Sequence, residues 1–130
     1  MKPLKRKVVV IVEKTNTGFS AFAANLDAYT TGKNVSQLQE NILEALSLYY
    51  EDKGFTVEKN NIVLQFDLQQ FFQYYKVLNS KHLAQKIGMN PTLLSQYVQG
   101  RKKPSLQQSE RIIQGIRQIG KELSELTLTS

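Results

Sequence analysis

The hydrophobic pattern of this chain changes about halfway along it, and this change constrains the fold more than any other feature. Residues 7–13, KVVVIVE, form a continuous β-branched run of strand length. After residue 67, apolar residues recur at the three- and four-residue spacing of helices. We therefore expect a sheet-containing part, whose first strand is buried on both faces or nearly so, followed by an all-helical part.

The first part contains the signals of a hairpin. The turn at 15–18, TNTG, includes Asn and Gly residues that accept positive φ, and it joins the first strand to a returning strand at 19–23. A short third strand is expected at 28–30, and a last strand at 61–67 follows an intervening helix. The order of elements predicts an α+β fold, in which a helix packs on one face of a small antiparallel sheet.

The intervening helix is marked by its cap and its apolar stripe. Asn34 or Ser36 can accept hydrogen bonds from the first free N–H groups, and Ser36 with Gln39 fits a capping box. Gly54 is a suitable stop signal. The apolar stripe consists of Leu38, Ile42, Ala45, Leu46 and Tyr49.

The second part predicts two short helices joined by a tight turn. The first is capped by Ser80 and ends at Gly88, where a left-handed residue is expected. The second has Asn90 as its N-cap and Pro91 at its first position, where a missing N–H costs nothing. Gly100 ends it, and the residues expected to face inward are Leu93, Leu94 and Val98.

A longer helix closes the chain. Ser105 and Gln108 fit a second capping box. Gly115 and Gly120 weaken this helix, and we expect it to break near Gly120. The residues of its apolar face are Ile112, Ile113, Ile116 and Ile119.

An aromatic stripe at 68–78 lies between the two parts. We interpret this stretch as a connecting helix, so that residues 1–67 and 79–130 form two domains. Its aromatic side chains are candidates for core or for a dimer interface. The two surfaces we consider for a dimer are the C-terminal stretch 123–128 and the side chains of Phe71, Phe72, Tyr74 and Tyr75.

Positive charge is concentrated in the helical part. Of the net charge of +6, residues 79–130 contribute +5, from eight Lys/Arg and three Asp/Glu. This imbalance predicts an anionic partner, although a solvated basic face remains the alternative. There is no cysteine, no signal-peptide pattern and no apolar run of membrane-spanning length, so we expect a cytoplasmic protein without a membrane partner.

The second short helix combines an apolar face with a polar one. Its polar residues are Thr92, Ser95, Gln96 and Gln99. Amide side chains can pair bidentately with adenine in the major groove, and the loop of Arg101, Lys102 and Lys103 suits phosphates. The N–H groups of the helix start, with Asn90, are a further candidate phosphate site. A helical hairpin with a polar outer face is the alternative.

The segment 83–105, LAQKIGMNPTLLSQYVQGRKKPS, resembles the helix-turn-helix of the Xre family, the class of the lambdoid phage repressors and Cro. The matching positions are Leu83, Ala84, Ile87, Gly88, the region of Ser95, Gly100 and Pro104. The resemblance implies that Asn90, Pro91, Thr92 and Gln96 meet bases or flanking phosphates of double-stranded operator DNA. Pro91 departs from the usual polar residue, so the reading of bases falls mainly to Thr92 and Gln96, with Ser95 in support.

Residues 7–52 resemble the N-terminal domain of HicB antitoxins. The matching residues are Gly18, Phe19, Ala21, the TTG at 30–32, Leu38, Ile42, Ala45 and Leu46. The resemblance implies a truncated RNase H-like fold that binds a HicA toxin, a small ribonuclease, and blocks its active site. It also implies that the C-terminal domain represses the shared operon as a homodimer or higher oligomer, without a cofactor.

Two other functions compete with an antitoxin. One is a stand-alone repressor whose first domain binds an effector or only dimerises. The other is a two-metal nuclease, for which the candidate carboxylates are Glu13, Glu40, Glu44 and Asp67. Because the first strand has only aliphatic residues at its middle, we expect that the chain is not an enzyme.

Overall fold

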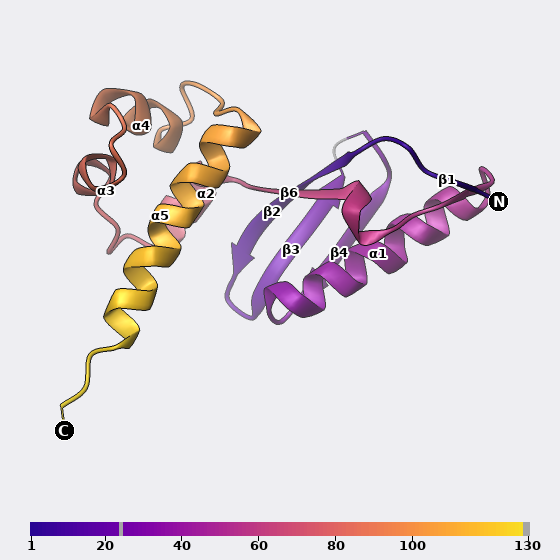
Figure 1. The fold of residues 1–130 in the computed structure, drawn as a ribbon, viewed down its shortest axis with the longest axis horizontal. Coiled ribbons are helices and arrows are strands. Elements are labelled where there is room, and N and C mark those ends of the chain that lie inside the picture. Colours follow the sequence, from indigo (N-terminus) through magenta and orange to yellow (C-terminus); the bar gives the residue numbers. More distant parts are fainter. Residues whose placement is uncertain (24, 129–130) are drawn as a thin grey trace. The chain divides into compact units, whose positions relative to one another are not determined.

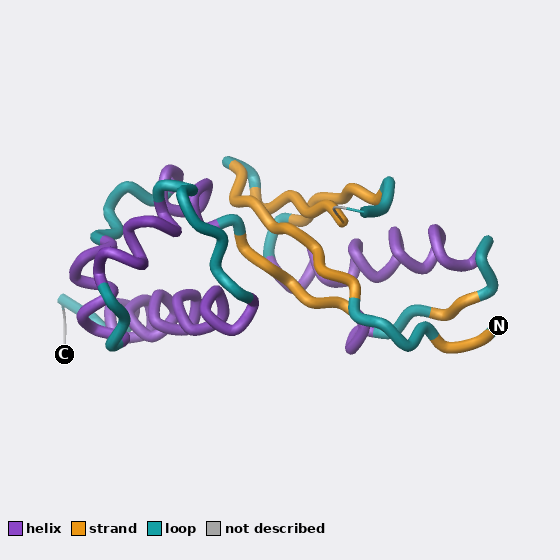
Figure 2. Tube along the Cα trace, turned by 90° about the horizontal axis from the view of Figure 1, so that it is seen from above, coloured by secondary structure: helices purple, strands orange, loops and turns teal. Residues whose placement is uncertain are grey.

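The computed structural model describes residues 1–23 and 25–128 of the chain (Figures 1 and 2). The structure is a mixed α/β one, with five α-helices and a small four-stranded sheet among the described residues. The chain divides into two compact units, Met1–Asp67 (unit 1) and Leu68–Ser130 (unit 2). Within the described ranges, no helix has the length and apolar character that crossing a membrane would require.

Unit 1 is an antiparallel meander followed by a helix and a returning strand. Its elements are β1 (Lys2–Pro3), β2 (Val8–Thr15), β3 (Gly18–Ala23), β4 (Ala28–Gly32), α1 (Val35–Glu51), β5 (Phe55–Thr56), a 3₁₀ turn (Lys59–Asn61) and β6 (Ile62–Phe66). The strand order in the main sheet is β4-β3-β2-β6, and β1 pairs separately with β5. Because β6 runs parallel to β2, the sheet is mixed, and the expected purely antiparallel sheet is wrong.

The first strand of the main sheet is buried on one face only. Val8, Val10 and Val12 are buried, whereas Val9 is 36% exposed and Ile11 is half-buried. The expectation of burial on both faces is therefore wrong. The physical reason is that α1 covers a single face of the sheet (Figure 1), so alternate residues of β2 differ in their surroundings.

The helix α1 begins at Val35 and is capped by Asn34 rather than by Ser36. The Asn34 side-chain oxygen accepts a hydrogen bond of 2.8 Å from the backbone N–H of Gln37. The buried stripe continues to Tyr50 and not, as expected, to Tyr49. The buried positions of this helix recur every four residues, and residue 50 is the next one after Leu46. The full buried set on this helix is Leu38, Ile42, Leu46 and Tyr50.

Two glycines of unit 1 allow backbones to approach closely. Gly18 has φ 153°, and a Cβ added there would lie 2.2 Å from the carbonyl oxygen of Gly32. A Cβ on Gly32 would lie 2.5 Å from the backbone nitrogen of Leu38. Both contacts are shorter than any side chain tolerates, so these two residues fix how β3 and β4 meet the start of α1.

Unit 2 consists of helices α2 (Leu68–Tyr74), α3 (Ser80–Ile87), α4 (Pro91–Val98) and α5 (Leu106–Ser124). The expected connecting helix at 68–78 ends at Tyr74, and it belongs to this unit because Leu68 and Phe72 are buried in its core. The buried core residues of unit 2 are Leu68, Phe72, Leu83, Ala84, Met89, Leu94, Tyr97 and Ile112.

The last helix, α5, runs without a break through Gly120, so the expected break is wrong. One glycine in a helix costs about 1 kcal/mol relative to alanine. Ile116 and Ile119, which precede this glycine on α5, pack against the core of unit 2. Their packing on one face outweighs the local cost.

Candidate nucleic-acid interface

The turn between α3 and α4 is closed by caps on both sides. At the end of α3, Gly88 adopts the left-handed conformation with φ 71°. At the start of α4, the Asn90 side-chain oxygen accepts from the N–H groups of Thr92 (2.8 Å) and Leu93 (3.4 Å). Two residues, Gly88 and Met89, thus separate α3 from the cap of α4, and the Met89 side chain is buried in the core of unit 2. The two short helices are therefore joined rigidly.

The first of these helices is capped by Asn79 and not by Ser80. The Asn79 side-chain oxygen accepts a hydrogen bond of 3.1 Å from the N–H of His82, and Ser80 is the first helical residue. Both residue types cap helices well, so sequence alone could not choose between two adjacent candidates.

Arg111 on α5 holds the same turn from outside, and the sequence patterns did not reveal it. Its Nη2 donates to the carbonyl oxygens of Ile87 (2.7 Å) and Gly88 (3.0 Å). The last carbonyls of a helix lack hydrogen-bond partners within the helix and lie at the negative end of the helix dipole. A positively charged guanidinium is therefore well matched to them. A contact between residues more than twenty positions apart leaves no local signal that could have revealed it.

The two faces of α4 separate as the sequence indicates, with one difference in the core. Leu94 is fully buried, and Leu93 and Val98 are packed against the core. Tyr97, which the sequence did not place inside, is buried as well. It lies three positions after Leu94 and four after Leu93, so its helical spacing indicates the buried face. Its polar hydroxyl group is the reason why the sequence did not place it there.

The polar residues of α4 share the opposite face. Thr92 is exposed and Gln96 is half-buried, and their four-residue spacing places them one turn apart. Ser95 and Gln99 lie beside them, where Gln99 Nε2 donates to Ser95 Oγ over 3.3 Å. The structure therefore brings these four side chains onto a single polar surface, suited to hydrogen bonding with base edges.

The start of α4 differs from the expectation of a free phosphate site. Pro91 has no N–H, and the N–H groups of Thr92 and Leu93 are taken by Asn90. Asn90 itself is exposed and keeps its amide NH₂ for a ligand, since only its oxygen acts as the cap. The backbone N–H groups at this helix start are thus not available to a phosphate.

The basic loop is tied to the end of α4. The carbonyl oxygen of Gln96 accepts from the N–H groups of Arg101 (2.9 Å) and Lys102 (3.3 Å), and Gly100 takes φ 77° to make this turn. The side chains of Arg101, Lys102 and Lys103 are all exposed. Three cations are therefore displayed directly beside the polar face of α4, where they can contact phosphates.

The helix α2 supports the same end of α4. Gln69 Nε2 donates to the carbonyl oxygen of Gln99 over 3.4 Å, and the Gln69 side chain fills the space beside Gly100. A Cβ on Gly100 would lie 2.4 Å from Gln69 Oε1. The position of α4 is thus fixed by α2 at one end and by Arg111 near the other.

The four candidate carboxylates of a nuclease do not converge in unit 1. Glu13 on β2 and Asp67, directly after β6, are neighbours, because Val12 pairs with Phe66 and the N–H of Asp67 donates to the carbonyl of Val12. Glu40 and Glu44 are exposed on α1, on the other side of the sheet. The described residues contain no cluster of three His, Cys, Asp or Glu side chains that could hold a metal ion.

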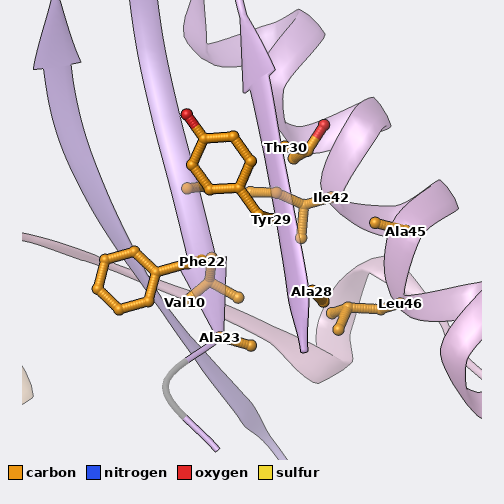
Figure 3. Close-up of a pocket in the computed structure, with 10 residues that line it drawn as sticks. Val10, Phe22, Ala23, Ala28, Tyr29, Thr30, Ile42, Ala45 and Leu46 are labelled. Atoms are coloured by element: carbon orange, nitrogen blue, oxygen red, sulfur yellow. The ribbon is translucent and has the colours of Figure 1, made fainter. Parts of the chain in front are cut away.

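Two hollows among the described residues of unit 1 are small for an effector. A pocket between the sheet and α1 (Figure 3) has a volume of about 10 Å³ and is lined by residues such as Ala28, Ala45 and Leu46. A groove of about 200 Å³ lies where Arg6 reaches Tyr50. The Tyr50 hydroxyl accepts a hydrogen bond from Arg6, and this contact raises the pKa of that guanidinium. Both volumes are below the roughly 300–1,000 Å³ of ordinary ligand pockets.

No family model matches this chain, and the comparisons with curated proteins and with solved structures also gave no match. Assignment of a function therefore depends on the geometry of unit 2, on the topology of unit 1 and on the motifs in the sequence.

Proposed function

We propose that this protein is an antitoxin that binds operator DNA through unit 2 and a HicA-type toxin through unit 1. The observation that carries the DNA-binding part is the α3–turn–α4 arrangement. It presents a polar helix face beside three exposed cations, on a unit with an excess of positive charge. This combination is what a helix-turn-helix of the Xre type requires.

In this proposal α4 is the recognition helix. Thr92 and Gln96 contact base edges in the major groove, and Ser95 supports them. Arg101, Lys102 and Lys103 contact phosphates, which gives affinity for any duplex and a strong dependence on salt. Asn90 contributes through its NH₂ group, and Pro91 supports the helix start only.

The topology of unit 1 supports the toxin-binding part. An antiparallel meander, a helix and a strand parallel to the first strand of the meander are compatible with a truncated RNase H-like fold. The glycines of the HicB-like motifs have a clear structural role, since Gly18 and Gly32 permit the close contact between β3, β4 and α1. We propose no catalytic role, because the carboxylates of this unit are dispersed.

Two experiments test the proposal. Expression of the reading frame next to this gene should arrest growth, co-expression of this chain should restore it, and the two proteins should co-purify. Separately, the purified chain should bind a duplex from its own promoter more tightly than random duplex at equal salt. A harmless neighbour that does not co-purify would contradict the antitoxin role, and equal binding to both duplexes would contradict the operator role.

A further inference from the structure

The face of the four-stranded sheet opposite α1 is apolar at its centre. Val8, Val10 and Val12 are buried toward α1, so Val9 and Ile11 of the same strand belong to the opposite face. When one face of a sheet meets water, the residues on that face are usually polar. An apolar face in this position is therefore suited to cover by another molecule.

The apolar positions lie beside one another across all four strands. Ile11 pairs with Phe22, and Phe22 pairs with Tyr29 on β4. Val9 pairs with Val63 on β6. Phe22 is 38% exposed and Tyr29 is 68% exposed, and Figure 3 shows both rings on the side of the strands away from α1. Directly paired side chains are close neighbours, so these residues form one continuous patch.

The two ends of this face carry opposite charges. From Lys7, which directly precedes β2, along the strand to Glu13, the outward positions are Lys7, Val9, Ile11 and Glu13, which are cationic, apolar, apolar and anionic. Asp67 follows β6 beside Glu13 and adds a second carboxylate at that end. Lys7 lies at the end of the face opposite to these carboxylates. Its side chain is exposed, and its Nζ donates to the carbonyl of Asn60.

We propose that two copies of this chain pack against each other through this sheet face. A two-fold axis across the strands reverses the direction of β2 in the second copy. It then places Lys7 of each copy near Glu13 of the other and the apolar centres in contact. Such self-complementarity is what a two-fold interface requires, and two sheets that pack in this way form a sandwich.

The size of the face sets the strength of this association. Four strands about 4.8 Å apart, with five residues of about 3.3 Å each, give a face of roughly 300 Å² per copy. Standard protein interfaces bury about 800 Å² per partner, so the dimer lies at the weak end and depends on concentration. This dimer forms without the toxin. Two chains joined through the sheet face together carry two copies of α4.

The test is the mass of the full-length chain in solution. Light scattering or sedimentation should measure the average mass of the wild type across about 1–300 µM, which suits a weak interface. This mass should rise with concentration, and the rise should include a doubling of the mass of the 14.8 kDa chain. Tyr29→Glu and Phe22→Glu should each remove this doubling at every concentration. The matched control is Leu48→Glu on α1, which is 62% exposed and should associate like the wild type.

A charge exchange tests the arrangement of the two copies. Lys7→Glu and Glu13→Lys should each weaken the association at least several-fold, and the double variant should recover it. Circular dichroism should show that every variant is folded, and Tyr29→Glu carries little risk because its side chain is largely exposed. A wild type that stays monomeric would overturn the proposal, and this holds even if the sheet face then binds a different protein. So would Tyr29→Glu that associates like the wild type, or a double variant no better than the single ones.

Discussion

Thr92 and Gln96 lie one turn apart on the polar face of α4, and they are the residues on which base recognition depends in this proposal. Gln96→Ala and Thr92→Ala should each lower the discrimination between operator and random duplex by about 1–3 kcal/mol, because a base contact is lost. Anisotropy titrations on both duplexes at one salt concentration measure this. The control is Gln118→Ala, an exposed glutamine on α5. If Gln96→Ala weakens both duplexes equally, this face does not contact the bases.

Lys102 differs from these residues because its exposed side chain lies in the loop after α4 and not on the helix. Lys102→Ala should weaken binding to every duplex and reduce the slope of log K against log salt by about one unit, since one phosphate contact is lost. Binding constants between about 50 and 200 mM salt give this slope. Lys33→Ala, an exposed lysine of unit 1, should leave it unchanged.

Arg111 acts on α4 only through the turn that precedes it. Arg111→Ala removes two charge-assisted hydrogen bonds to the carbonyls of Ile87 and Gly88. The free energy of unfolding of unit 2 should fall by about 1–2 kcal/mol, which urea titration followed by circular dichroism can measure. Arg117→Ala on the same helix is the control. If Arg111→Ala costs no more stability than this control, the contact does not hold the turn.

At the scale of elements, the two glycines of α5 have opposite surroundings. A Cβ on Gly115 would lie 2.4 Å from Ile87 Cγ2, whereas nothing lies within 4 Å of a Cβ on Gly120. Gly120→Ala should therefore stabilise unit 2 by about 0.5–1 kcal/mol through helix propensity. Gly115→Ala should destabilise it, because overpacking of about 1–3 kcal/mol exceeds that gain. Urea titration of both variants decides this, and equal stabilisation by both would contradict the close contact of α3 with α5.

The elements that the sequence predicted are those with local signals. Turn residues located the β2–β3 hairpin, and the pair Asn90–Pro91 located the start of α4, because caps and turns depend on neighbouring residues. The parallel pairing of β6 with β2 joins residues more than fifty positions apart and had no local signal. The same holds for Arg111, whose partners at the end of α3 become neighbours only after folding.

The candidate site is predictable to the extent that it depends on one helix. The polar face of α4 follows from helical periodicity, so the sequence alone assigns Thr92, Ser95 and Gln96 to one surface. The loss of the phosphate site at the helix start is not predictable in this way. It depends on which amides the Asn90 side chain reaches, and the sequence leaves that choice open.

At the scale of the whole molecule, the boundary between the two units decides where the chain can be divided. The structure places it between Asp67 and Leu68, so the stretch 68–78, interpreted from the sequence as a connecting helix between two domains, falls within unit 2. The difference is α2, whose Leu68 and Phe72 belong to the core of unit 2. Burial of a large apolar side chain contributes about 1.5–3 kcal/mol, so removal of both is a large loss for a small unit.

A fragment of residues 68–130 should therefore fold and bind duplex DNA at high concentration, whereas residues 79–130 should be largely unfolded under the same conditions. Thermal unfolding by circular dichroism and anisotropy with promoter duplex measure the two properties. In the complementary experiment, residues 1–67 should retain toxin binding, because the core of unit 1 extends no further than Phe66 among the described residues. If residues 79–130 fold as stably as 68–130, then α2 is a connector and not part of the core. If residues 1–67 fold but bind no toxin while the full chain does, toxin recognition requires unit 2 as well.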